Sequence, residues 1–292
     1  MWLFFASISA LLSAAAAIVQ KKILFRLNAL EFSFLVSAII LIFSSFVPFT
    51  VDVTSIPMST ILIIIGKSLL GGCAFLLVMM SLKHNQISNA LPLLGLTPGV
   101  TAVVALLLLG DSLQGWEWAG LGLMMLGTFI LEVQSPQQSI RSFKASLLTK
   151  SHSYIFGALA LFAISSVADK LLVSNHRISP LVVLFYQHLV YCFVFASLLL
   201  LQKRSLREVI SKGKEPFLLI ATVAVLTIAY RFAQLEATKD APVALVLAVK
   251  RTSILYASFL GGKIFAEEKL VRRLAGATLI VVAGFFILRY LA

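Results

Sequence analysis

Two adjacent cations, Lys250 and Arg251, lie in the middle of an apolar run from Ala241 to Gly262. A charged side chain at the centre of a membrane-spanning helix costs roughly 2.5–3.5 kcal/mol even on a lenient insertion scale. This cost is tolerated where the side chains face a water-filled cavity and hold a negative group. Arg offers a planar fork for phosphate or carboxylate, and Lys offers a compact point charge. The pair therefore predicts a binding site for an anion within the membrane.

Deep cations outnumber deep carboxylates in the apolar runs, and an unpaired buried cation is costly, so a mobile anion is the natural partner. We expect Arg231 and Lys67 to assist Lys250 and Arg251. Four neutral side chains are predicted to shape selectivity: Tyr230, Gln234, Tyr186 and Gln187. Three further groups are candidates for carrying a coupling proton: Asp169, Glu236 and His188.

Some of these residues have structural interpretations as well. Asp169 and Lys170 could form an ion pair at a helix end, and Lys67 could bind a backbone carbonyl. A pair between Arg231 and Glu236 is disfavoured, because helical partners lie three or four positions apart and these lie five apart. Exchange without ion coupling fits the sequence equally well.

The composition is that of an all-α polytopic membrane protein. Of 292 residues, 60% are hydrophobic and 12% charged, and the mean hydropathy is +1.01. Apolar runs near 20 residues recur without the alternation of barrel strands. The net charge of +12 lies in short links and inside helices, so it predicts contact with a lipid bilayer and no nucleic-acid partner. Neither metal-ligand spacing nor a phosphate-binding loop occurs, so no metal or cofactor is expected.

Ten transmembrane helices are predicted, as two halves of five. The first half covers residues 1–134, a polar linker covers 135–153, and the second half covers 154–292. The expected spans are 2–22, 30–49, 58–81, 88–109, 115–134, 154–174, 179–202, 216–236, 240–262 and 270–290.

The two halves resemble each other. An offset of 149 residues places Gln20-Lys21 on Asp169-Lys170, and an offset of 157 places Asp111 on Glu268 and Gly127 on Gly284. Because five is odd, the second copy must enter the membrane from the opposite side. The expected architecture is therefore an inverted repeat with a site at midplane between the halves.

Loop charges predict the orientation. Alternate links, starting with the first, carry 16 Lys and Arg, whereas the other links and the termini carry 3. The positive-inside rule then places both termini outside. Two links, Ile140–Leu148 and Leu206–Ile210, have apolar residues at helical spacing among basic ones and are candidates for short interfacial helices.

The repeat core resembles the EamA-type repeat of the drug/metabolite transporter superfamily. The resemblance is carried by Ser81-Leu82-Lys83-His84, then Pro98, Leu109-Gly110-Asp111 and Gly127, and it covers almost the whole chain. Val249-Lys250-Arg251 is also similar to triose-phosphate translocators of that superfamily, in which a Lys-Arg pair binds substrate phosphate. This implies the same role for Lys250 and Arg251. The family precedent places both termini in the cytoplasm, against the loop charges.

Together these features predict a secondary transporter, and not an enzyme, in a bacterial inner membrane. It would move a small organic anion, phosphorylated ones included, by alternating access. One alternative is a proton-coupled exporter of amino acids or drug-like metabolites. Another is a membrane-embedded enzyme acting on a lipid-linked substrate, although no paired carboxylates or His cluster support it. The sequence leaves the oligomeric state undetermined.

Overall fold

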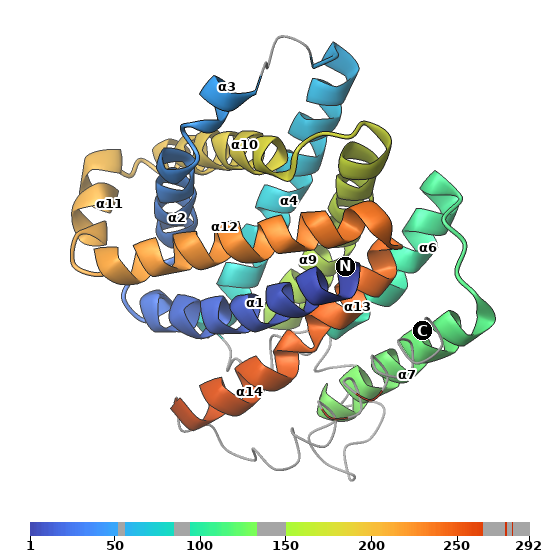
Figure 1. Ribbon diagram of the computed structural model, residues 1–292. Helices are drawn as coiled ribbons and strands as arrows, with labels where there is room; N and C mark the ends of the chain where they lie inside the picture. Colours follow the sequence, from blue (N-terminus) through green and yellow to red (C-terminus); the bar gives the residue numbers. More distant parts are fainter. Residues whose placement is uncertain (52–55, 85–93, 133–149, 265–277, 279–281, 283–292) are drawn as a thin grey trace.

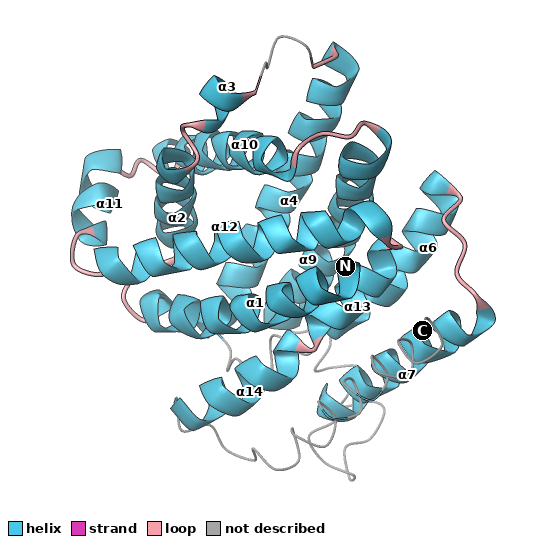
Figure 2. Ribbon diagram, viewed as in Figure 1, coloured by secondary structure: helices cyan, strands magenta, loops and turns pink. Residues whose placement is uncertain are grey.

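The computed structural model describes residues 1–292 except 52–55, 85–93, 133–149, 265–277, 279–281 and 283–292. The described part of the chain is helical and contains no strand (Figures 1 and 2). In the first half the elements are α1 (Trp2–Leu24), α2 (Ala29–Phe43), α3 (Val47–Thr50), α4 (Met58–His84), the 3-10 turn η2 (Leu94–Leu96), α6 (Thr97–Leu109) and α7 (Gly115–Glu132).

The second half begins with α9 (Lys150–Lys170), which continues as a π-helical segment, η3 (Leu171–Asn175). The remaining elements are α10 (Pro180–Leu201), α11 (Leu206–Gly213), α12 (Phe217–Asp240), α13 (Val243–Arg251) and α14 (Ser253–Ile264). The predicted helix over Leu206–Ile210 is present as α11. The predicted interfacial helix over 140–148 and nearly all of the tenth span, 270–290, lie outside the described residues.

Six helices in the described residues are long and apolar enough to cross a membrane. They are Trp2–Leu24, Ala29–Thr50, Met58–His84, Ser153–Asn175, Pro180–Leu201 and Phe217–Asp240. These match the first, second, third, sixth, seventh and eighth predicted spans. Large apolar side chains such as Phe4, Phe193 and Leu218 are exposed on them, as expected for surfaces that face lipid.

The ninth predicted span, 240–262, is helical but is divided into two helices. Helix α12 runs on to Asp240, Pro242 is the N-cap of α13, and α13 ends at Arg251. Thr252 separates α13 from α14, and its side-chain hydroxyl donates to the Val249 carbonyl at 2.8 Å. The span is therefore two short helices that meet directly after the cation pair.

Helices of the two halves pack against each other. Helix α1 lies beside α12, α4 packs on α9, and α2 packs on α10 (Figure 1). The largest apolar cluster includes Ala14, Phe32, Ala74, Ile155 and Phe195, and so draws on both halves. Side chains that point inward from either half consequently meet at a shared interior.

Lysine side chains tie helix ends together by capping backbone carbonyls. Lys21 on α1 donates to the Leu82 carbonyl near the end of α4 at 2.5 Å. Its counterpart at the offset of 149 residues, Lys170 on α9, donates to the carbonyls of Thr238 at 3.0 Å and Ala241 at 2.9 Å, at the end of α12. Carbonyls at helix C-termini lack intrahelical partners, so these ammonium groups satisfy them.

A close helix approach occurs at Gly71, which faces α9 and α10. A Cβ placed on Gly71 would overlap the Tyr191 hydroxyl and lie 3.2 Å from Ser165 Oγ. Tyr191 is 5% exposed and stacks on Phe75, so its ring has little room to move. Small residues at such positions are what allow membrane helices to approach closely.

We expect Gly71→Ala to destabilise the protein by up to about 2 kcal/mol. Overpacking of about 1–3 kcal/mol outweighs a gain in helix propensity of up to about 1 kcal/mol. Gly122→Ala is the matched control, because no described atom lies within 4 Å of a Cβ there. Melting temperatures in detergent test this, and adding Tyr191→Phe should restore part of the loss. A Gly71→Ala protein that melts at or above the native temperature would contradict the packing argument.

Candidate functional site

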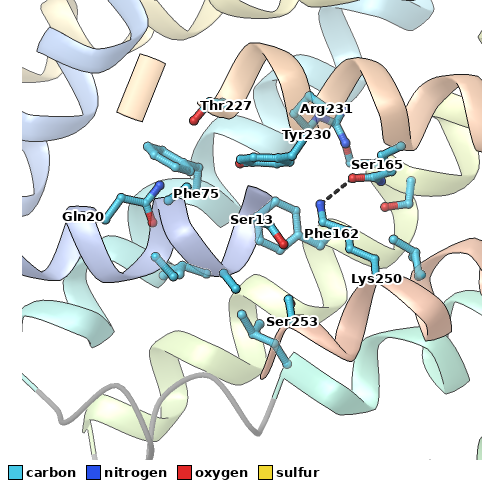
Figure 3. A pocket seen from close by; sticks show the side chains of 18 of the residues that line it. Ser13, Gln20, Phe75, Phe162, Ser165, Thr227, Tyr230, Arg231, Lys250 and Ser253 are labelled. Carbon is cyan, nitrogen blue, oxygen red and sulfur yellow. Dashed lines mark hydrogen bonds between the residues drawn. The ribbon is translucent and has the colours of Figure 1, made fainter. Parts of the chain in front are cut away.

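A cavity of about 160 Å³ lies in the shared interior. A water molecule needs roughly 10–15 Å³ of such volume, so the cavity has room for a small organic solute. Its walls come from helices of both halves, chiefly α1, α4, α9, α10, α12 and α13. Figure 3 shows side chains from these helices converging on it, with the ring of Tyr230 near the centre.

The cation pair lies on this cavity, at the end of α13. Lys250 Nζ donates to the Gln234 side-chain oxygen at 2.5 Å (dashed in Figure 3) and lies 4.6 Å from the centre of the Tyr230 ring. Arg251 donates to the Thr97 hydroxyl at 3.0 Å, while its Nε is buried without a hydrogen-bond partner. Within the described residues, all of these partners are neutral and neither cation forms a salt bridge.

The end of α13 partly compensates this charge. The C-terminus of a helix carries about half an elementary negative charge, which favours cations in the last turn by about 0.3–1 kcal/mol. Lys250 and Arg251 occupy that last turn because the helix ends at Thr252. The helix break therefore helps to hold two positive side chains at one end of the cavity.

In a second cluster of charged residues, Lys67, Asp169 and Arg231, the charged groups pair with one another. Lys67 Nζ lies 2.5 Å from one Asp169 carboxylate oxygen and 2.7 Å from the Gln187 side-chain oxygen. Arg231 lies 2.9 Å from the other oxygen of Asp169 and 3.0 Å from the same Gln187 oxygen. The side chains of Lys67 and Asp169 are 0% and 3% exposed. The Asp169 carboxylate thus pairs with one cation on α4 and one on α12 through its two oxygens, and the three groups together keep one net positive charge.

Most of the predicted site residues gather on the cavity. The lining includes eight of them: Asp169, Gln187, His188, Tyr230, Arg231, Gln234, Lys250 and Arg251. Both ring nitrogens of His188 are buried, and no described residue forms a hydrogen bond with them. The expected ion pair of Asp169 with Lys170 is absent, since Asp169 pairs with Lys67 and Arg231 and Lys170 binds carbonyls.

Three predicted residues lie elsewhere. Lys67 is not among the lining residues, because Asp169 and Gln187 enclose its ammonium group. Tyr186 packs into an apolar cluster, since adjacent helical residues point about 100° apart and its neighbour Gln187 faces inward. Glu236 pairs with Lys239 at 2.7 Å near the end of α12.

Several lining residues carry no signal that the sequence reasoning used. They are aromatic or hydroxyl side chains of ordinary membrane helices, namely Ser13, Phe75, Phe162, Ser165 and Ser166. Thr97, whose hydroxyl accepts a hydrogen bond from Arg251, directly follows η2 in a segment of mostly apolar residues. Gln20 had a signal, because the repeat aligns it with Asp169.

The model of the EamA-like transporter family matches residues 1–133 and again 149–289. The chain belongs to this family. As an EamA-like transporter it is an integral, multi-pass membrane protein, and members of the family are transporters and not enzymes. The doubled match also agrees with the repeated sequence pattern.

A solved structure described only as "Crystal structure of protein" has the same fold as this EamA-like chain. It matches with a TM-score of 0.67 at 18% sequence identity, over 97% of each chain. At that identity the likeness concerns the fold alone. No curated protein sequence matches the chain.

Proposed function

We propose that this EamA-like protein carries a small organic anion, phosphorylated ones included, and that Lys250 and Arg251 bind the charged group. The observation that supports this most is the difference between the two charge clusters. Asp169 pairs with Lys67 and Arg231, whereas Lys250 and Arg251 contact only neutral groups within the described residues. Both face a cavity large enough for a solute. An anionic group would supply the negative charge that no described residue gives to this pair.

The mechanism that suits this site is alternating access between two inverted halves of five helices, residues 1–134 and 154–292, joined by 135–153. The cavity lies between helices that come from both halves, where such transporters bind substrate. The break at Thr252 adds a discontinuous helix beside the site, which is also typical of them. Of the three candidates for a coupling proton, His188 lines the cavity, Asp169 lines it but is held by Lys67 and Arg231, and Glu236 is displaced from it.

The similarity of Val249-Lys250-Arg251 to triose-phosphate translocators supports phosphate as one head group. Carboxylate is chemically equivalent for this purpose, because Arg binds both in a bidentate manner. We also propose that the protein lies in a bacterial inner membrane. The exporter of amino acids or cationic drugs is disfavoured, since Asp169, the one carboxylate among the described lining residues, is already held by two cations.

Transport by purified protein in liposomes tests the proposal. We expect uptake of at least one labelled phosphate or carboxylate metabolite, with inhibition by other small organic anions. Cationic drugs and zwitterionic amino acids at the same concentration should not inhibit. Protein-free liposomes and heat-inactivated protein serve as controls. Uptake of a cation or an amino acid that no organic anion inhibits would refute the proposed substrate class.

A further inference from the structure

One wall of the cavity is a stripe along α1. Ser13, Ala14, Ala16, Ala17 and Gln20 line it, at spacings that place them on one helix face. Gln20 lies seven positions after Ser13, which is about 10 Å along the helix at 1.5 Å per residue. The small side chains leave room beside the helix, and Gln20 is the one large polar side chain of the stripe. The cavity is therefore long in this direction.

Gln20 is a buried amide facing this cavity. Its side chain is lined up on the cavity wall, the residue is 6% exposed, and no described residue forms a hydrogen bond with its amide. A primary amide offers two N–H donors and an acceptor oxygen. The amide atoms of Gln20 are not among the buried polar atoms that lack a partner, so they are open to the cavity that the residue lines. Its counterpart in the second half, Asp169, has every oxygen engaged. The amide is thus arranged to bond with something other than the protein.

The two ends of the cavity differ in charge. Figure 3 shows Gln20 and Phe75 on one side of Tyr230, and Lys250 and Arg231 on the other. None of the described lining residues of α1, α2 or α4 is charged. The neighbour of Gln20, Lys21, is engaged by the Leu82 carbonyl and is not part of the described lining. An anionic group consequently fits one end, and a neutral hydrogen-bonding group fits the other.

We propose that Gln20 is a second subsite, which recognises a hydroxyl, carbonyl or amide at the far end of an elongated organic anion. The charged head would lie on Lys250 and Arg251, and the body would run along the alanines of α1 beneath Tyr230 and beside Phe75. This rests on the proposed function, because the head must be anionic for the far end to reach Gln20. The added claim is that the site selects anions by their length and by a neutral polar group at the end far from the charged head.

Matched pairs of probe anions separate the binding of the charged head from the binding of the far end. Glucose 6-phosphate and butyl phosphate share a head, as do gluconate and butyrate, but the second of each pair lacks hydroxyl groups. Binding to the detergent-purified full chain is measured by calorimetry. We expect at least one pair to differ by about tenfold in Kd in favour of the hydroxylated member, which corresponds to one or two neutral hydrogen bonds.

Gln20→Leu keeps the size of the side chain and removes its amide. We expect the ratio within that pair to fall to about twofold, while the binding of butyl phosphate or butyrate stays unchanged. Gln202→Leu is the matched control, because Gln202 is exposed at the end of α10 and should keep the native ratio. Native melting of both variants shows that they fold.

Two results would overturn the subsite. In one, native protein binds both members of each pair equally; in the other, Gln20→Leu keeps the native ratio. Either can occur while Lys250→Ala still abolishes binding, which leaves the proposed function standing. If none of the four anions binds, both proposals fail together.

Discussion

Lys250→Ala should reduce anion uptake by at least about 30-fold, and Arg251→Ala should do the same. Truncating one partner of a buried, hydrogen-bonded charge pair costs about 2–5 kcal/mol, and each 1.4 kcal/mol is a factor of ten. The loss should appear in binding of the anion as well as in flux. Folding should be retained, since Lys250 and Arg251 bond only to neutral side chains within the described residues.

Initial uptake rates in liposomes with equal protein content measure this effect. Lys22→Ala is the matched control, because Lys22 is exposed on α1 and its removal should leave uptake unchanged. Gln234→Leu is informative as well, since it removes the neutral partner of Lys250 while keeping the cation. If each of the two single variants, Lys250→Ala and Arg251→Ala, takes up the anion at the native rate, the anion binds elsewhere.

Asp169→Asn should destabilise the protein by about 3–5 kcal/mol. Removing one partner of a buried ion pair leaves an uncompensated charge, and here two cations, Lys67 and Arg231, lose their shared carboxylate. The asparagine keeps the shape but also presents an amide NH₂ toward donors. The melting temperature in detergent, or the yield of folded protein, reports the loss.

Glu236→Gln is the comparison for Asp169→Asn. It breaks the ion pair between Glu236 and Lys239. These side chains are 22% and 34% exposed, respectively, so the change in stability should stay below about 1 kcal/mol. Equal melting temperatures for the two variants would indicate that Asp169 is not the charge that holds α4, α9 and α12 together.

Much of the helical layout follows from local sequence. Runs of apolar residues near 20 predict the spans, and caps such as Asn28 with Glu31, which form a reciprocal capping box, fix where α2 begins. The break at Thr252 could not be predicted in this way. Pro242 marks the start of α13, but nothing in the residues around Thr252 separates a continuous apolar helix from two short ones.

The site was predictable only in outline. The residue types identified the buried cations, but which of them is neutralised depends on contacts between distant segments. Lys67 and Asp169 are 102 positions apart, and Arg231 and Asp169 are 62 apart. Hydrophobic periodicity does not determine how these helices are rotated against one another, so the sequence does not show that Lys67 is enclosed by Asp169 while Arg251 faces the cavity. Tyr186 and Gln187 show the same difficulty, since one helix rotation decides which of them faces the cavity.

The broken helix that carries Lys250 and Arg251 also bears on how the chain enters the bilayer during synthesis. Two cations near its centre cost roughly 5–7 kcal/mol on the insertion scale. Nine Leu, Ile, Val and Phe residues between Ala241 and Gly262 return about 3–5 kcal/mol at 0.3–0.6 each. This segment therefore falls short of partitioning into lipid by itself. Its integration depends on the preceding helices already being assembled to receive it.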